Sequence, residues 1–111
     1  MTTIFTKIIS GEIPSEKVFE NEKIIAIKDI HPKAPIHILI IPKKPIHDLQ
    51  SLQKEDFHLL GEIVTAAQEI AKKFHVENGY RLVTNNGLKA GQTIFHLHFH
   101  FLAGDKMRDL P

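Results

Sequence analysis

The chain has 111 residues, of which 42% are hydrophobic and 24% are charged, and its formal net charge is +1. This composition is typical of a single globular domain over residues 1–111 and excludes a disordered chain. The near-neutral charge gives no electrostatic basis for binding nucleic acid or an anionic membrane. The absence of cysteine excludes disulfides, a thiol nucleophile and cysteine-based metal sites.

The N-terminal segment does not resemble a signal peptide, because Lys7 and Glu12 interrupt its apolar residues. No segment approaches the roughly 20 apolar residues that a membrane-spanning helix needs. We therefore expect a cytoplasmic protein that does not bind a membrane.

The first half of the chain predicts a short helix followed by three strands. Thr3 is suited to cap a helix whose apolar residues are Ile4, Phe5, Ile8 and Ile9. Pro14 prevents this helix from continuing. Segments rich in β-branched residues then predict strands at 17–20, 24–29 and 36–41.

The second half predicts one long helix over residues 51–75, capped by Ser51 and followed by Gly79. Its apolar positions follow helical spacing and are Leu60, Ile63, Val64, Ala67, Ile70, Ala71 and Phe74. Two further strands are expected at 80–84 and 94–102. This order of elements predicts an α+β fold with a five-stranded antiparallel sheet, one short N-terminal helix and one long helix.

The most informative segment, 96–102, reads His-Leu-His-Phe-His-Phe-Leu. If it is a strand, His96, His98 and His100 share one face and the apolar residues share the other. Imidazoles are costly to bury without partners, so we expect their face to border a cleft. A neutral imidazole has a lone pair that can attack phosphorus, and neighbouring imidazoles can donate hydrogen bonds to phosphate oxygens.

Two other interpretations of the three histidines remain open at this point. The rings can be structural, or they can bind zinc, since two or three histidines on a strand face are suitable ligands. The motif itself contains no Asp, Glu or Cys, but a ligand from a distant part of the chain is compatible with the spacing.

The pattern His-φ-His-φ-His-φ-φ, where φ is apolar, resembles the motif of the histidine triad nucleotide-binding family, and residues 96–102 match it throughout. The likeness extends over nearly the whole chain. The other segments that carry it are 4–9, 12–14, 29–32, 37–43 and 91–93. The chain resembles the small purine nucleoside phosphoramidase branch more than the larger dinucleoside polyphosphate hydrolases.

The resemblance implies that His98 attacks the α-phosphate and forms a nucleotidyl–histidine intermediate, which water then hydrolyses. The backbone carbonyl of His96 would orient the His98 ring. His100 would bind phosphate, His37 would support the site from another strand, and Thr93 would donate toward the leaving group. The implied reaction is hydrolysis of a purine nucleoside 5′-phosphoramidate or an acyl-adenylate, which releases AMP or GMP.

The resemblance also implies how the nucleotide is bound. Asn85, Gly91 and Thr93 would contact the phosphate, and Asp29 would hold the ribose, since two carboxylate oxygens can accept both protons of a vicinal diol. The implied base pocket consists of Ile4, Phe5, Ile8, Ile27 and Ile30. Without the resemblance, the loop residues are an ordinary hairpin connection, Asp29 is a turn aspartate and the apolar residues are core.

The family arrangement implies a homodimer with a continuous ten-stranded sheet and requires no cofactor and no metal. The alternative functions are a dinucleoside polyphosphate hydrolase, a nucleotide-binding regulatory module without turnover, and a zinc-binding protein. Three features depart from the family pattern: Pro45 replaces a common histidine, Ile27 replaces a common aromatic residue, and the C-terminal tail lacks a Trp-Pro-Pro ending. These departures concern the base and the leaving group more than the chemistry.

Overall fold

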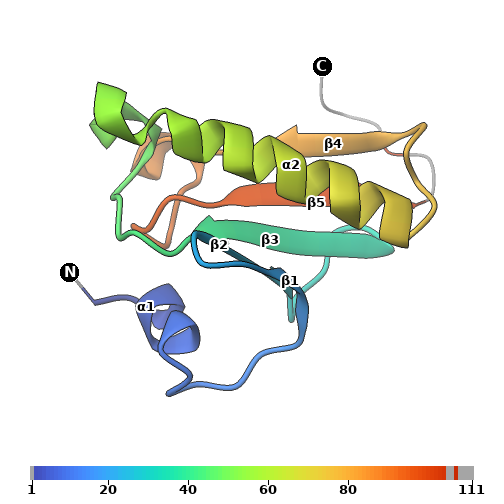
Figure 1. The fold of residues 1–111 in the computed structure, drawn as a ribbon, viewed down its shortest axis with the longest axis horizontal. Coiled ribbons are helices and arrows are strands. Elements are labelled where there is room, and N and C mark those ends of the chain that lie inside the picture. The colour runs from blue at the N-terminus through green and yellow to red at the C-terminus, as the bar shows by residue number, and fades with distance from the viewer. Residues whose placement is uncertain (1, 105–106, 108–111) are drawn as a thin grey trace.

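The computed structural model describes residues 2–104 and residue 107. In this part of the chain, five strands form one antiparallel sheet in the order β1-β2-β3-β5-β4, and a helix lies on each of its faces (Figure 1). The helices are α1 (Ile4–Ile9) and α2 (His58–Lys73); the strands are β1 (Lys17–Glu20), β2 (Ile24–Lys28), β3 (Ile36–Pro42), β4 (Tyr80–Val83) and β5 (Phe99–Ala103). The α+β class, the five-stranded antiparallel sheet and the two helices predicted from the sequence are confirmed.

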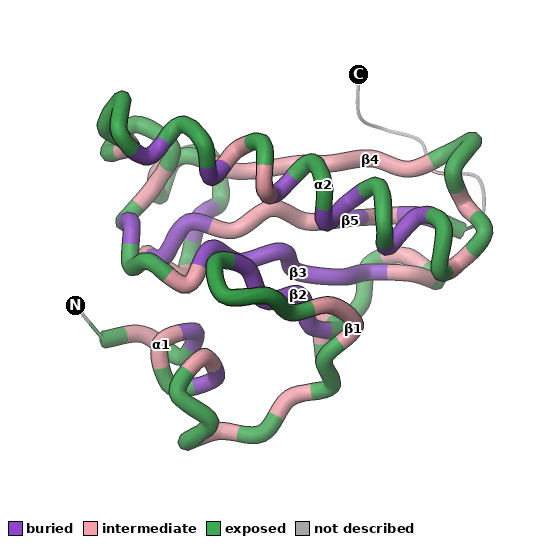
Figure 2. Tube along the Cα trace, in the orientation of Figure 1, coloured by how far each residue is buried: buried purple, intermediate pink, exposed green. Residues whose placement is uncertain are grey.

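The strands β2 and β3 are buried on both faces, which explains why their sequences are nearly continuous runs of isoleucine. Figure 2 shows these central strands as buried segments. Alternate side chains face opposite helices. The residues packed on the α2 side include Ile24, Ala26, Ile38 and Ile40, and those packed on the α1 side are Ile25, Ile27, Leu39 and Ile41.

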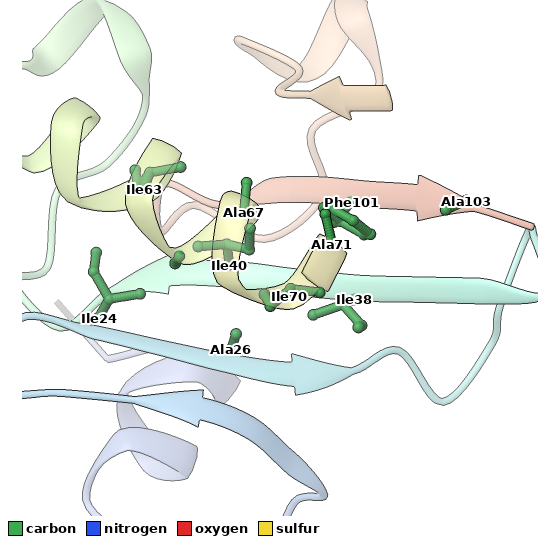
Figure 3. Close-up of a cluster of buried hydrophobic side chains, with 11 residues drawn as sticks. Ile24, Ala26, Ile38, Ile40, Ile63, Ala67, Ile70, Ala71, Phe101 and Ala103 are labelled. Atoms are coloured by element: carbon green, nitrogen blue, oxygen red, sulfur yellow. The ribbon is translucent and has the colours of Figure 1, made fainter. Parts of the chain in front are cut away.

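The packing of α2 follows the predicted helical spacing with one exception. Figure 3 shows Ile63, Ala67, Ile70 and Ala71 on the side of α2 that faces Ile38, Ile40 and Phe101 of the sheet. Val64 was expected in this apolar stripe, but it is 47% exposed. Leu59 and Ala66, which the prediction did not include, are buried instead.

The long helix begins at His58 and not at residue 51. Two short 3₁₀ turns precede it, η1 (Leu49–Ser51) and η2 (Lys54–Asp56). Ser51 therefore does not cap α2. Its backbone N–H donates to the side chain of Asp48 at 2.9 Å, so local bonding by the aspartate ends this segment as a separate turn.

The C-terminal end of α2 is closed by His75 and not by Gly79. His75 adopts a left-handed conformation with φ of 58°. Its N–H bonds to the carbonyl of Lys72 at 3.2 Å, and the N–H of Val76 bonds to the carbonyl of Ala71 at 2.9 Å. These two bonds form a Schellman motif. The residue with positive φ in this motif is usually glycine, and here it is His75.

The last strand begins at Phe99 and not at residue 94. Residues 94–96 form a bend, and the Leu97 N–H donates to the carbonyl of Ile46 at 2.6 Å, outside the sheet ladder. The sequence pattern alternates as a strand does, but these tertiary contacts take the backbone out of the strand. Of the three histidines, only His100 lies in β5, so the alternation of side chains between the two faces of the sheet places His100 but does not place His96 or His98.

The register of β3 and β5 gives the α1 face its polar residues. His100 pairs with Leu39, which packs toward α1. His37 is two residues from Leu39 on the same strand, so it lies on the same face and diagonally adjacent to His100. The backbone N–H of Asp29 bonds to the carbonyl of His37 at 2.9 Å, which brings Asp29 opposite this histidine.

Among the helices that the structure describes, none has both the length and the hydropathy that crossing a bilayer requires.

We predict that Gly104→Ala destabilises the protein. Gly104 has φ of +117°, and an added Cβ would lie 2.7 Å from Cβ of Pro35, just before β3. A non-glycine residue in this conformation costs about 1–3 kcal/mol. Urea unfolding should show a lower free energy of unfolding for Gly104→Ala. Gly79→Ala is the matched control, since its Cβ would meet nothing within 4 Å; equal midpoints for both variants would contradict the prediction.

Candidate active site

A hollow of about 530 Å³ lies between α1 and the strands β2 and β3, and we call it the α1 hollow. Its lining includes every residue implied for the base pocket and the ribose: Ile4, Phe5, Ile8, Ile27, Asp29 and Ile30. Ile13, Leu39 and Ile94 also line it, although they were not predicted as site residues. The segments that build its walls are far apart in the sequence, so only the fold brings them together.

His98 lies beside this hollow with one ring nitrogen fixed. Its Nδ1 is 2.7 Å from the carbonyl oxygen of His96. A carbonyl only accepts, so Nδ1 carries the hydrogen and Nε2 of the neutral ring has the free lone pair. The ring meets Phe5 edge-on at a centroid distance of 4.9 Å, and Phe5 lines the hollow. The hydroxyl of Thr84 donates to the His98 carbonyl at 2.8 Å and holds the backbone.

His96 does not border a cleft. Its side chain is fully buried, and Nε2 is 2.7 Å from the carbonyl oxygen of Pro42, to which it donates. The prediction that the three histidines share one exposed face is therefore wrong for His96, because the bend at 94–96 turns this ring inward. The ring ties the segment before β5 to the end of β3, and the residue's carbonyl meets His98.

His37 and His100 form a hydrogen-bonded pair whose tautomers can be assigned. The Lys33 backbone N–H donates to Nδ1 of His37 at 3.0 Å, so the hydrogen of this neutral ring is on Nε2. That Nε2 is 2.9 Å from Nδ1 of His100, which must accept. The hydrogen of the neutral His100 ring is therefore on Nε2. The His98 and His100 ring centroids are 5.2 Å apart.

All four of these imidazoles favour the neutral form. Burial is the main cause that lowers the pKa of His37, His96, His98 and His100, and it lowers the pKa of His100 to about 4 with help from the neighbouring His98 and His37. The charge of Asp29 acts in the opposite direction on the pKa values of His37, His98 and His100. At neutral pH the site therefore presents a nucleophilic lone pair on His98 rather than an imidazolium.

Asp29, His37 and His100 also place three possible metal-ligand atoms within 4.8 Å of one another. A metal at Nε2 of a neutral His37 would require the hydrogen on Nδ1, where the Lys33 N–H already points at 3.0 Å. The N–H of the His37 ring and the backbone N–H of Lys33 would then point at each other. The Lys33 N–H and His100 thus account for both ring nitrogens of His37 by hydrogen bonds, an arrangement that would have to change for His37 to bind zinc.

The residues implied for phosphate binding lie in the loop between β4 and β5. Gly91 is exposed and left-handed, with φ of 98°, at the end of η3 (Leu88–Ala90). Asn85 directly follows Thr84, whose hydroxyl bonds to the His98 carbonyl. Thr93 is exposed and lines a second hollow of about 400 Å³, the Thr93 hollow, which shares Ile4 and Ile94 with the α1 hollow.

Gln92 has a structural role that the sequence did not reveal. The residue is 3% exposed, and its side-chain oxygen accepts from the Gly87 N–H at 2.8 Å. Its amide nitrogen donates to the carbonyls of His47 and Ile94 at 3.0 and 3.1 Å. Gln92 therefore holds the loop before the histidine segment, and a glutamine in a glycine-containing turn gives no sign of this from sequence alone.

Two of the three departures from the family pattern, Pro45 and Ile27, lie in described residues. Pro45 is exposed in the segment between β3 and η1. Ile27 lines the α1 hollow, so an aliphatic wall stands where an aromatic residue is common. The tail after Gly104 lies outside the described residues except for Met107, whose carbonyl accepts from the Arg81 guanidinium at 3.1 Å.

Comparison with known proteins identifies the family of this chain. A family model described as scavenger mRNA decapping enzyme C-term binding matches residues 2–109. A HIT-like protein of Chlamydia muridarum is 56% identical over 104 residues, which cover 94% of this chain and 82% of the relative. The chain therefore belongs to the histidine triad (HIT) family.

Solved structures show the same fold. A HIT family hydrolase from Clostridium thermocellum has a TM-score of 0.93 and 46% identity, over 96% of this chain and 94% of that chain. A histidine triad nucleotide-binding protein from Candida albicans has a TM-score of 0.80 and 32% identity, over 99% of this chain and 86% of that chain.

We predict that His100 makes the protein less stable in acid. Its pKa falls from an ordinary 6.5 to about 4 on folding, so the unfolded chain binds a proton that the native ring does not. Above about pH 6.5 the His100 ring is neutral in both states, and its contribution to the free energy of unfolding is fully present. This contribution is lost as the pH falls toward 4, because the unfolded chain then binds the proton. Urea unfolding at pH 7.5, 6 and 5 should show a steeper loss for the native chain than for His100→Gln.

The control for this measurement is His58→Gln, since His58 is exposed at the start of α2. It should follow the native chain. Parallel pH dependence of the native chain and His100→Gln would contradict the prediction.

Proposed function

We propose that this protein is a nucleotide-binding hydrolase that cleaves purine nucleoside 5′-phosphoramidates or acyl-adenylates through a covalent intermediate on His98. The observation that carries the proposal is the 2.7 Å contact between Nδ1 of His98 and the His96 carbonyl, which leaves the Nε2 lone pair free beside the α1 hollow. The names of the two structural relatives, a hydrolase and a nucleotide-binding protein, support the same class.

In the first step, the lone pair on Nε2 of His98 forms a bond to the α-phosphorus. The bond from phosphorus to the leaving nitrogen or oxygen breaks, and its electron pair goes to the leaving group, which takes up a proton. His100 donates its Nε2–H to a phosphate oxygen, where charge develops. The leaving group takes its proton from water. Thr93 lines the adjoining hollow, where its hydroxyl can donate a hydrogen bond toward the leaving group.

In the second step, the oxygen of a water molecule forms a bond to phosphorus, one proton of this water is released to solvent, and the bond to His98 breaks. The nucleoside monophosphate leaves, and the ring recovers its lone pair. The His96 carbonyl holds the Nδ1 hydrogen throughout, so it stabilises the positive charge that the ring carries while bonded to phosphorus. No step requires a metal or a cofactor.

The α1 hollow supplies the nucleotide specificity. Its apolar walls, which include Phe5, fit a flat base, and the carboxylate of Asp29, which also lines the hollow, accepts the hydrogens of the ribose hydroxyls. Asn85 and Gly91 belong to the loop that would meet the phosphate through amide and backbone N–H groups. We assign AMP or GMP as the nucleotide product.

We also propose that two copies form a homodimer. β4 is an edge strand of the sheet, and pairing with a second β4 would extend it to ten strands. The neighbouring helix α2 exposes Val64, and Phe57 just before it is 52% exposed, which provides apolar surface for the same contact.

We predict that His98→Asn abolishes nucleotidyl transfer, because asparagine cannot form the bond to phosphorus. Native protein mixed with a fluorogenic adenosine phosphoramidate and quenched within one turnover should carry an adenylyl group on the peptide that contains residues 96–101. Mass spectrometry detects the adduct, and fluorescence follows release of the amine.

His58→Asn serves as the control and should react as the native protein does. A similar single-turnover rate for His98→Asn, or an adduct on another peptide, would remove His98 as the nucleophile. Faster turnover of diadenosine tri- or tetraphosphate than of the phosphoramidate would instead favour the dinucleoside polyphosphate hydrolase.

We predict that kcat/KM is constant near neutral pH and falls only below the ordinary histidine value of 6.5. The neutral form of His98 attacks, and burial lowers its pKa, so protonation removes activity only in more acidic solution. Rates measured with the phosphoramidate between pH 4 and 8 test this. A rate that rises as the pH falls through this range would exclude a neutral imidazole as nucleophile.

A further inference from the structure

The single hydrogen on Nε2 of His37 faces two acceptors. Nδ1 of His100 is 2.9 Å away and Oδ2 of Asp29 is 3.4 Å away. The Lys33 N–H occupies the other nitrogen of the ring, so the neutral ring has no second hydrogen to offer. The two acceptors therefore compete for one hydrogen.

The same Asp29 carboxylate is within reach of a ligand in the α1 hollow. Its Oδ1 accepts from the His31 backbone N–H at 2.7 Å, which fixes the orientation of the group and directs Oδ2 toward His37. The Asp29 side chain is 18% exposed, whereas that of His37 is 3% exposed. A hydroxyl that enters the hollow thus meets Asp29 directly and can affect His37 only through it.

We propose that Asp29 and His37 transmit the presence of the ribose diol to the phosphate-binding ring of His100. When the diol donates to Asp29, the carboxylate attracts the His37 hydrogen less, and His37 donates more fully to His100. A ring that accepts a stronger hydrogen bond at Nδ1 is a better donor from Nε2, because hydrogen bonds in a chain polarise one another. This inference rests on the proposed function and adds a positioning role for His37.

The coupling has a kinetic consequence that simple ribose binding lacks. If Asp29 only held the ribose, loss of the diol would weaken binding and leave the rate at saturation unchanged. With the coupling, loss of the diol also slows the transfer to His98, since His100 stabilises the charge on the phosphate less. We expect the saturating rate to fall roughly threefold to tenfold.

The experiment compares adenosine 5′-phosphoramidate with its 2′,3′-dideoxy analogue in single-turnover assays over a range of protein concentrations. For the native protein, the dideoxy analogue should show both weaker half-saturation and a lower saturating rate. For His37→Gln, only the half-saturation should differ. Glutamine carries two amide hydrogens and can donate to both acceptors at once, so the competition disappears while a donor to His100 remains.

Glu12→Gln is the matched control for this comparison, since it removes an exposed carboxylate next to Ile13, which lines the same hollow. It should keep the native difference in saturating rate. Equal saturating rates for the two substrates on native protein, or an unchanged difference in His37→Gln, would overturn the coupling. These results leave transfer to His98 intact, whereas absence of any transfer overturns the proposed function and the coupling together.

A second measurement does not depend on turnover or on the folding of His37→Gln. Nitrogen NMR of the histidine rings in native protein should show that adenosine, which has no phosphate, shifts the His100 ring signals, and that 2′,3′-dideoxyadenosine at saturation leaves them nearly unchanged. In ligand-free Asp29→Asn, the His100 signals should differ from those of native protein. Identical His100 signals in all these states would overturn the proposal.

Discussion

The hydrogen bond from Nδ1 of His98 to the carbonyl of His96 is the interaction on which the chemistry of this site depends. It fixes the tautomer, so it decides which nitrogen has a lone pair and where that lone pair points. The carbonyl is in place because the His96 ring is buried and bonded to the carbonyl of Pro42. In a regular strand, His96 and His98 would lie on the same face. The bend before β5 instead turns the His96 ring into the interior and leaves the His96 carbonyl in contact with the ring of His98.

The sheet separates stability from function by its two faces. The α2 side buries Ile40, Phe101 and their neighbours in a hydrophobic cluster, which provides the rigid support. The α1 side uses the same strands to align Asp29, His37 and His100 beside a hollow. Because side chains alternate, a residue that packs on α2 and a residue that serves the site can be adjacent in sequence, and a change in register would disturb both.

The sequence predicted those features that depend on local pattern. The strands follow from their isoleucine-rich segments, and α1 follows from Thr3, whose hydroxyl accepts from backbone N–H groups of the first turn. The start of α2 and the start of β5 were predicted wrongly, because Asp48 and the carbonyl of Ile46 redirect the backbone there. The resemblance to the family implied that the His96 carbonyl orients the His98 ring, and the structure has this contact at 2.7 Å. The tautomer of His37 was not predicted, because the backbone N–H of Lys33 sets it and a backbone group does not appear as a residue type.

Burial of the histidines links reactivity to stability. Desolvation lowers the pKa of His98 and His100 and so keeps a lone pair and a neutral donor ready at neutral pH. The same desolvation makes the native state bind protons less readily than the unfolded chain, so stability must decrease in acid. Asp29 reduces this loss of stability in acid, since its charge raises the pKa of His37 and His100. A ligand that engages Asp29 would therefore change the electrostatics of His37, His98 and His100 together, so the proposed recognition of the ribose and the proposed chemistry at phosphate act on the same charge.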